Sequence, residues 1–234
     1  MTQGAELDLT PATTLYAYDD AGQLTSVTDP RGYSTSYEYN DRGLLRRVEL
    51  PDPDGSGPMF AMAQAYRYDN VGRLIHEYGM FTRLTEYEYD SRDRITNVTY
   101  PDPNDQGAST RPEVSFTFDD VGNVLTETDP LGNVTTYTYD KESRVKTITG
   151  ADPDGAGSLT SPVISYVYDA VGNVTSLTDP NSGVTTFEYD TAGRLTKQTG
   201  ADPDGAGSLL SPVTTYEYNG LGKLSKVTDP AGRD

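Results

Sequence analysis

The feature that most constrains the fold of this chain is a short motif that occurs nine times: an aromatic residue, any residue, a second aromatic residue and then Asp or Asn. The spacing between successive motifs alternates between 21 and 29 residues, which gives a 50-residue unit. A fixed period of this size is typical of proteins built from many copies of one supersecondary element. The nine pairs are Tyr16 and Tyr18, Tyr37 and Tyr39, Tyr66 and Tyr68, Tyr87 and Tyr89, Phe116 and Phe118, Tyr137 and Tyr139, Tyr166 and Tyr168, Phe187 and Tyr189, and Tyr216 and Tyr218.

Each copy of the motif continues in the same way. Seven copies have Gly three residues after the Asp or Asn, whereas Asp93 and Ser143 take this place in the other two, and an aliphatic residue follows two positions later in every copy. Aromatic residues two apart lie on the same face of a strand, and an Asp or Asn side chain can accept the N–H groups that begin a turn. Gly supplies the positive φ that closes a short loop with a bulge. The motif therefore predicts a β-hairpin.

The return strand of this hairpin leaves one question open. A second apolar residue often lies three positions after the aliphatic one, as Val27 follows Leu24. Side chains on one face of a strand are an even number of residues apart. Either both faces of the sheet are partly covered or a bulge shifts the register.

The hairpins are joined by short connections, most of which carry Asp-Pro-x-Gly, and by long connections with eight further residues. We interpret residues 1–15 as a degenerate lead-in and residues 16–234 as nine repeats, the last of them truncated. Tight turns pair consecutive strands antiparallel. The fold class is therefore all-β: about 18 short strands of repetitive hairpins, with aromatic rows along one face of an extended, curved or hollow sheet.

Composition limits the possible partners and chemistry. The formal net charge of −18 repels nucleic acid and anionic membrane surfaces. Cysteine is absent, which excludes disulfides and thiolate metal sites. Leu, Ile, Val and Phe together make up only about 18% of the chain, so a core depends on the 18 tyrosines. The first residues lack the pattern of a secretory signal, so we expect any export to depend on sequence outside this segment.

The motif Tyr189-Asp190-Thr191-Ala192-Gly193-Arg194-Leu195, followed elsewhere by Asp-Pro-x-Gly, resembles the YD repeat of RHS-type proteins, and the resemblance extends over residues 16–232. It implies a long β-sheet that spirals into a solenoid-like shell. Such shells surround C-terminal toxin domains in bacterial toxins, and related repeats form barrels in teneurins and wall-associated proteins. By resemblance, we expect a structural segment located outside a bacterial cell or on its surface. Its partners are expected to be further repeats, a second copy bound end to end, or an enclosed C-terminal domain.

We expect no enzymatic activity. His76 is the only histidine, and no Cys or repeated partner accompanies it, so the triads of nucleophilic catalysis cannot be assigned. The abundant carboxylates recur with the turns, and turn chemistry explains them first. We therefore interpret His76 as an ordinary strand residue.

The long connections allow one alternative. Acidic residues recur there beside Gly, as in the first half of a calcium-binding loop, although each loop offers fewer oxygens than the six to eight that Ca²⁺ requires. Either these are solvated Pro-Asp-Gly turns or Ca²⁺ bridges them with further backbone ligands. The candidate metal ligands are Asp52, Asp54, Asp102, Asp105, Asp152, Asp154, Asp202 and Asp204.

The aromatic rows also have two interpretations. They pack as the wall of the sheet, or they stack against sugar rings in an adhesin or carbohydrate-binding module. Strand spacing of the Tyr pairs favours packing. The glycan-binding alternative is tested by glycan arrays.

Overall fold

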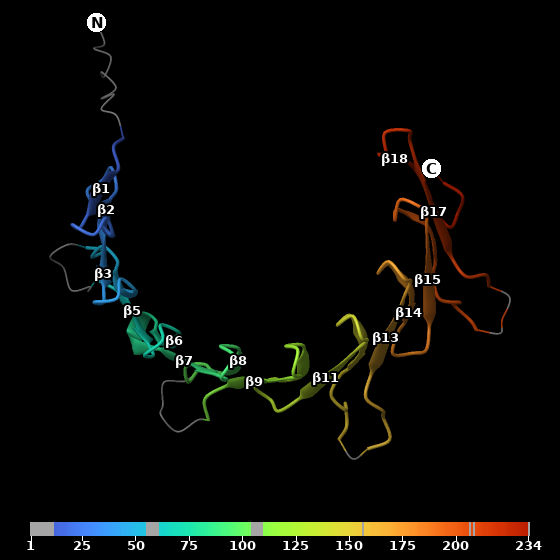
Figure 1. The fold of residues 1–234 in the computed structure, drawn as a ribbon, viewed down its shortest axis with the longest axis horizontal. Coiled ribbons are helices and arrows are strands. Elements are labelled where there is room, and N and C mark those ends of the chain that lie inside the picture. Colours follow the sequence, from blue (N-terminus) through green and yellow to red (C-terminus); the bar gives the residue numbers. More distant parts are fainter. Residues whose placement is uncertain are drawn as a thin grey trace, which may run out of the picture. The chain divides into compact units, whose positions relative to one another are not determined.

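A computed structural model describes residues 12–54, 61–103, 110–155, 157–205, 207 and 209–233. The chain forms two compact units, Met1–Val114 and Ser115–Asp234. Regular structure in the described residues is β-strand throughout, apart from one turn of 3-10 helix (Figure 1). The all-β prediction is confirmed.

In the first unit, each strand pairs antiparallel with the next one along the chain, from β1 to β8. The 3-10 turn η1 lies in the connection that lacks Asp-Pro. The elements are β1 (Leu15–Tyr18), β2 (Leu24–Thr28), β3 (Ser34–Tyr39), β4 (Leu45–Glu49), β5 (Ala63–Tyr68), β6 (Leu74–Tyr78), η1 (Met80–Thr82), β7 (Leu84–Tyr89) and β8 (Ile95–Thr99).

The second unit repeats this arrangement. Strand β9 begins just before the unit boundary, and each strand from β9 to β18 pairs antiparallel with the next. The strands are β9 (Glu113–Phe118), β10 (Val124–Thr128), β11 (Val134–Tyr139), β12 (Val145–Thr149), β13 (Val163–Tyr168), β14 (Val174–Thr178), β15 (Val184–Tyr189), β16 (Leu195–Thr199), β17 (Val213–Tyr218) and β18 (Leu224–Thr228).

A β-bulge lies at the same place in every hairpin. In the first hairpin Ala17 pairs with Ser26 whereas Tyr18 pairs with Leu24, so one extra residue of the return strand has no partner. The same shift occurs in the other eight hairpins. The bulge brings Val27 opposite Tyr16 and explains the odd spacing of the apolar residues.

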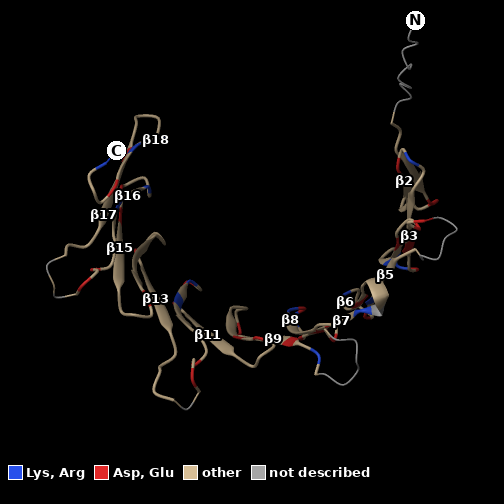
Figure 2. Ribbon diagram, turned by 180° about the vertical axis from the view of Figure 1, so that it is seen from behind, with Lys and Arg blue, Asp and Glu red and all other residues tan. Residues whose placement is uncertain are grey.

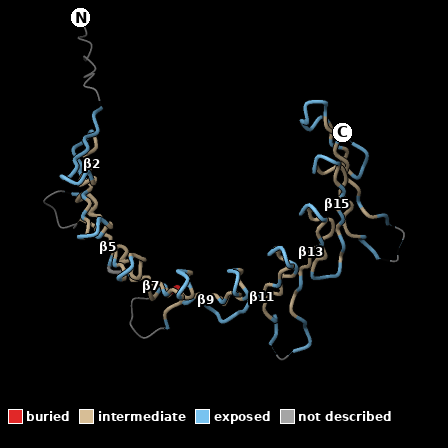
Figure 3. Tube along the Cα trace, in the orientation of Figure 1, coloured by how far each residue is buried: buried red, intermediate tan, exposed pale blue. Residues whose placement is uncertain are grey.

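The strands form a single layer. Among the described residues, Val98 is the one buried hydrophobic side chain, at 9% exposure, and no side chain is fully buried. Figure 3 shows strands of intermediate burial and exposed turns. The aromatic rows are therefore half-buried rather than enclosed, because no second layer covers them. Acidic segments recur in the long connections (Figure 2).

Candidate functional site

The repeated hairpin turn is held by its Asp or Asn side chain. In the turn that begins at Asp140, Oδ1 accepts the N–H groups of Glu142 and Arg144, both at 3.0 Å. The Asp140 N–H donates to the Arg144 carbonyl at 2.9 Å, and the Ser143 N–H donates to the Asp140 carbonyl at 3.1 Å. This is the three-residue hairpin loop with a bulge. The equivalent side-chain bonds occur at Asp19, Asn40, Asp69, Asp90, Asp119, Asp169, Asp190 and Asn219.

The third residue of this loop adopts a left-handed backbone conformation in all nine hairpins. Seven of these residues are Gly, but Asp93 and Ser143 take the same conformation, with φ of 63° and 61°. The short Asp-Pro-x-Gly connections use the same loop, and there Ser182 (φ 67°) takes the position before Gly183. One turn geometry therefore serves both ends of the strands, even where Gly is missing.

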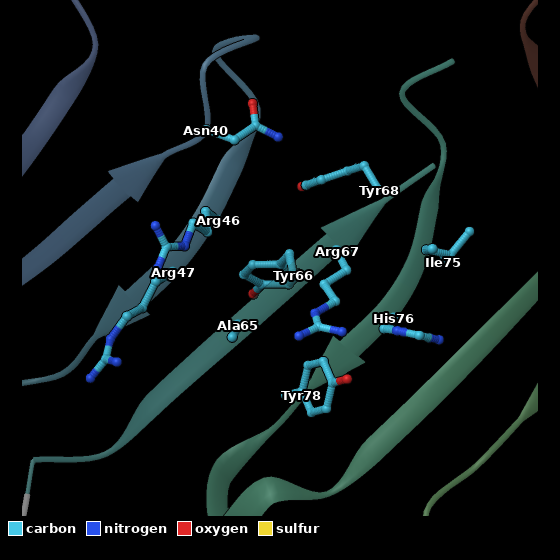
Figure 4. Close-up of a pocket in the computed structure, with 10 residues that line it drawn as sticks. All are labelled: Asn40, Arg46, Arg47, Ala65, Tyr66, Arg67, Tyr68, Ile75, His76 and Tyr78. Carbon is cyan, nitrogen blue, oxygen red and sulfur yellow. The ribbon is translucent and has the colours of Figure 1, made fainter. Parts of the chain in front are cut away.

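In seven of the nine pairs, the second aromatic residue is a Tyr that connects its hairpin to the preceding one. The Tyr139 hydroxyl donates to the carbonyl of Val124, the first residue of β10, at 2.7 Å. Figure 4 shows Tyr68 extending from β5 toward β4, where its hydroxyl meets the Leu45 carbonyl at 2.9 Å. The other such bonds join Tyr39 to Leu24, Tyr89 to Leu74, Tyr168 to Val145, Tyr189 to Val174 and Tyr218 to Leu195, at 2.7–3.0 Å.

Basic residues strengthen several of these interfaces. Arg144 Nε donates to Asp140 Oδ2 in its own turn at 2.6 Å, and its guanidinium lies 4.6 Å from the ring centroid of Tyr168 in the next hairpin. Arg144 also donates to the Asp169 carbonyl of that hairpin at 3.2 Å. Arg73 and Arg194 lie in the same way over Tyr89 and Tyr218, at 4.8 and 4.5 Å.

These contacts change the acidity of the groups involved. Partial burial raises the pKa of Asp69. Hydrogen bonds from the Arg73 N–H, the Arg73 guanidinium and the Val71 N–H outweigh burial and lower this pKa to about 2. Two of the first aromatics, Tyr87 and Tyr137, donate to a Glu carboxylate instead. Burial and the hydrogen bond from Tyr87 to Glu77, at 3.1 Å, raise the pKa of Tyr87 to about 12. Both shifts follow from groups held in fixed positions within the sheet.

The pocket in Figure 4, of about 500 Å³, contains the one histidine. The His76 Nε2 atom lies 3.4 Å from Glu86 Oε1, and Arg111 forms an ion pair with the same carboxylate. Arg67 lies over Tyr78 at 5.7 Å from the ring centroid. No carboxylic acid and no Ser, Thr or Cys nucleophile is among the residues lining this pocket. The carboxylate beside His76, that of Glu86, is not among the lining residues and forms its ion pair with Arg111.

The acidic long connections bond within themselves. Asp152 Oδ1 accepts the Asp154 N–H at 3.2 Å, and Asp154 Oδ2 accepts the Leu159 N–H at 3.1 Å. The Leu159 N–H is the main reason that the pKa of Asp154 is lowered. Asp202 and Asp204 repeat these bonds, and Asp52 bonds the Asp54 N–H likewise. Asp102 lies in the described chain, whereas Asp105 lies outside the described residues.

Calcium bridging by these loops is one of the two alternatives given above, and the contacts of the loops favour the other one, solvated turns. Within the described ranges, no three acidic or histidine side chains gather as a metal site would require. Because the carboxylates already accept N–H groups of their own loops, we expect Ca²⁺ added after chelation to leave the melting temperature unchanged up to millimolar concentration. Thermal unfolding followed by circular dichroism measures this, with Mg²⁺ as the control ion. A rise specific to Ca²⁺ would instead support bridging.

The turn itself yields a second prediction. Asp140→Ala removes the acceptor of two N–H groups and the partner of Arg144, so we expect the melting temperature to fall by about 2–6 °C. Asp140→Asn keeps Oδ1, as Asn40 and Asn219 do naturally, and should cost less than Asp140→Ala. Differential scanning calorimetry of both variants tests this order, and equal melting temperatures for all three proteins would contradict it.

Sequence reasoning found the aromatic pairs and the turn residues but missed the bonds between hairpins. The second aromatic is Tyr in eight of nine copies, whereas the first is Phe in two. This preference for a hydroxyl at one position was the available indication that it has an acceptor. Arg four residues after the turn Asp, in four copies, was the indication of the guanidinium contacts.

Comparison with known proteins agrees with this geometry. The family described as RHS Repeat matches residues 18–56, 68–104, 118–156 and 168–206, about two thirds of the chain, and the matches begin 50 residues apart. No curated protein matches the chain significantly.

Solved structures share the fold. A crystal structure of TcdB2-TccC3-TEV has a TM-score of 0.72 at 18% identity, over 92% of this chain and 11% of that one. The structure of a Photorhabdus luminescens Tc holotoxin pore has a TM-score of 0.57 at 18% identity, over 93% of this chain and 13% of that one. A crystal structure of TcdB2-TccC3 without its hypervariable C-terminal region has a TM-score of 0.56 at 18% identity, over 92% of this chain and 13% of that one. The chain thus spans about an eighth of the length of these proteins.

Proposed function

The chain belongs to the RHS repeat family, and on that premise we propose that it is a non-catalytic wall segment of an RHS shell that encloses a C-terminal passenger domain. The observation that carries the proposal is the series of seven Tyr hydroxyl bonds between successive hairpins. The most regularly repeated side chains of the sequence are thus used to hold the sheet together. Forming a wall is the function that requires all of these bonds.

Charge is consistent with this role. A net charge of −18 keeps a single-layered sheet soluble and suits a passenger of basic surface. The partners that we propose are the enclosed domain and further repeats of the same kind. No helix in the described part of the chain is long and apolar enough to cross a bilayer. We propose a location outside the cell from the family resemblance.

Glycan binding has less support from the contacts. Three Tyr rings of the repeated pairs, those of Tyr89, Tyr168 and Tyr218, have a guanidinium over one face, and that face is not free to stack on a sugar ring. The packing interpretation of the aromatic rows is therefore the one that we carry forward. Binding on a glycan array at micromolar protein would reopen the adhesin alternative.

The proposed function can be tested by exchanging wall segments. In a related RHS shell protein, the matching stretch is replaced by residues 16–233 of this chain, and protection of the enclosed C-terminal domain from protease is measured. We expect protection to persist. The control carries Tyr39→Ala, Tyr89→Ala, Tyr139→Ala and Tyr189→Ala in the inserted segment, and should lose it. Digestion of the passenger despite a folded insert would count against the proposal.

A further inference from the structure

Five residues that line the pocket of Figure 4 share one face of β4, β5 and β6, within the first unit. Residues opposite each other in neighbouring strands lie on the same face, and here Arg47 pairs with Ala65 and Ala65 with Tyr78. In the next row along the strands, Arg67 pairs with His76. Because the Ala65 side chain is the shortest of the five, the longer side chains around it border a hollow of about 500 Å³.

A β-bulge adds a further arginine to this pocket. Arg46 is the extra residue of β4 at the bulge between β3 and β4. Adjacent residues of a regular strand point to opposite faces, but a bulge re-aims a side chain. Arg46 and Arg47 consequently both line the pocket. Figure 4 shows their side chains on β4 and that of Arg67 on the neighbouring strand β5.

The positive charge of this pocket is only partly compensated. Arg47 Nη2 lies 3.0 Å from Glu49 Oε2. The guanidinium groups of Arg46 and Arg67 form no ion pair and no hydrogen bond with the described residues, and Arg67 lies over the Tyr78 ring. No acidic residue lines the pocket. Two uncompensated positive charges therefore lie together in a chain whose net charge is −18.

Two buried nitrogen atoms in the pocket also lack a hydrogen bond. They are Arg47 Nε and His76 Nδ1, which have no partner among the described residues. Buried polar atoms are nearly always hydrogen-bonded, and an arginine Nε–H can only donate. The Arg47 side chain is 42% exposed, so a rotation of its head group can present this N–H to the pocket. The missing partner is an acceptor oxygen.

The other repeats do not carry this set of side chains. In chain order, the counterparts of Arg46, Arg47, Arg67, His76 and Tyr78 are Thr96, Asn97, Thr117, Thr126 and Thr128 after 50 residues, and Lys146, Thr147, Val167, Ser176 and Thr178 after 100 residues. The hairpins that contain these counterparts have the same pairing and the same bulge. The basic and aromatic side chains of the pocket are therefore not required for the hairpin, which favours a role in binding.

We propose that this pocket binds the phosphate group of a small phosphate monoester. Such a group carries about −1.5 to −2 charges at neutral pH, which matches the free guanidinium groups of Arg46 and Arg67. A volume of about 500 Å³ lies in the range of small-molecule sites and leaves room for an organic part beside the Tyr78 ring. The site binds and does not cleave the ester, because no nucleophile lines it. The inference goes beyond the wall function and does not rest on it.

Isothermal titration calorimetry on the full chain tests this site. The probes are phenyl phosphate and inorganic phosphate, with ionic strength held constant by sodium chloride. We expect one equivalent of phenyl phosphate to bind, about tenfold more tightly than inorganic phosphate, because its ring packs against Tyr78. Equal affinities for the two probes would overturn the assignment to a monoester, since the pocket would then hold free phosphate.

Two substitutions remove one free guanidinium each. Arg46→Thr and Arg67→Thr introduce the residues that stand at Thr96 and Thr117, so the fold should persist, as circular dichroism will show. Each should weaken binding of phenyl phosphate about ten- to hundredfold. If either variant unfolds, Arg46→Gln or Arg67→Gln replaces it, since Gln keeps part of the aliphatic stem. The matched control Arg31→Thr removes an exposed arginine of a connection and the same net charge, and should change the affinity by less than about twofold.

Two further results would overturn the proposal. One is the absence of binding by the folded, unmodified chain at millimolar phenyl phosphate. The other is equal weakening by all three threonine variants, because net charge alone would then attract the anion. Either result leaves the wall function standing if the exchanged segment still protects its passenger. Digestion of the passenger alongside the expected binding would overturn the wall function alone.

Discussion

Replacing Tyr39, Tyr89, Tyr139 and Tyr189 together by Phe is expected to lower the free energy of unfolding by about 2–6 kcal/mol. Each substitution removes one hydroxyl bond between hairpins, at 2.7–3.0 Å, and retains the ring. A bond of this kind contributes about 0.5–1.5 kcal/mol net. In a repeat protein, stability is close to a sum of unit and interface terms, so four weakened interfaces should act together.

Urea unfolding followed by circular dichroism measures this loss. The chain provides its own control in Tyr18, which has the same repeat position but, among the described residues, is not one of the seven tyrosines whose hydroxyl bonds a neighbouring hairpin. Tyr18→Phe should leave the unfolding midpoint unchanged. If the fourfold variant unfolds at the same urea concentration as the unmodified protein, the hydroxyls do not hold the hairpins together.

The second large effect is a loss of stability at alkaline pH. Burial is the main cause that raises the pKa of eight tyrosines, reaching about 12 at Tyr87. A folded pKa above the unfolded value of about 10 means that the associated stability is complete below pH 10 and is lost as pH rises toward 12. An ionised tyrosine can no longer donate to its carbonyl. The tyrosines are Tyr66, Tyr68, Tyr87, Tyr89, Tyr137, Tyr139, Tyr168 and Tyr189.

At acid pH the turn carboxylates set the lower pH limit of the folded protein's stability. The folded pKa of Asp69, about 2, lies below the unfolded value of about 3.9, so its contribution is present above pH 4 and is lost as pH falls toward 2. The pKa values of seven other Asp residues at the same turn position are lowered in the same direction. They are Asp29, Asp90, Asp119, Asp129, Asp140, Asp169 and Asp190.

Melting temperatures between pH 2 and pH 12 test both limits, with phenolate absorbance recorded on the alkaline side. We expect a plateau between about pH 4 and pH 10 and a decline on either side of it. In the fourfold Phe variant the alkaline decline should be smaller, because fewer shifted hydroxyls remain, while the acid decline should be unchanged. Titration of all tyrosines together near pH 10, with no loss of structure, would contradict the alkaline limit.

Much of the fold could be predicted from sequence because local rules and the repeat agree. Three features specify the same hairpin: the alternation of the aromatic pair, the turn Asp and the following Gly. The motif that carries them occurs nine times. The bulge was one of two open alternatives, and only the observed pairing of Tyr18 with Leu24 decided between them. At Asp93 and Ser143 the hairpin context overrides the cost of a left-handed backbone, which the sequence alone does not show.

The contacts between hairpins could not be predicted in the same way. The acceptor of the Tyr139 hydroxyl is a backbone carbonyl, which leaves no trace in side-chain identity. The register between hairpins is equally hidden, because the connections differ in length while the pairing stays the same. The burial of the aromatic side chains could not be predicted from the pattern either. A Tyr-x-Tyr pair has the same sequence whether or not a second layer covers it.

Disulfide trapping of the register across a long connection tests the central claim most directly, because the chain has no cysteine of its own. Thr147 pairs with Ser165 between β12 and β13, whereas Val163 is two residues out of register with Thr147. The variant with Thr147→Cys and Ser165→Cys should oxidise rapidly and completely, since directly opposed residues meet the distance that a disulfide requires. The variant with Thr147→Cys and Val163→Cys should oxidise slowly. Faster or equal oxidation of the second variant would contradict a wall of hairpins joined in one register.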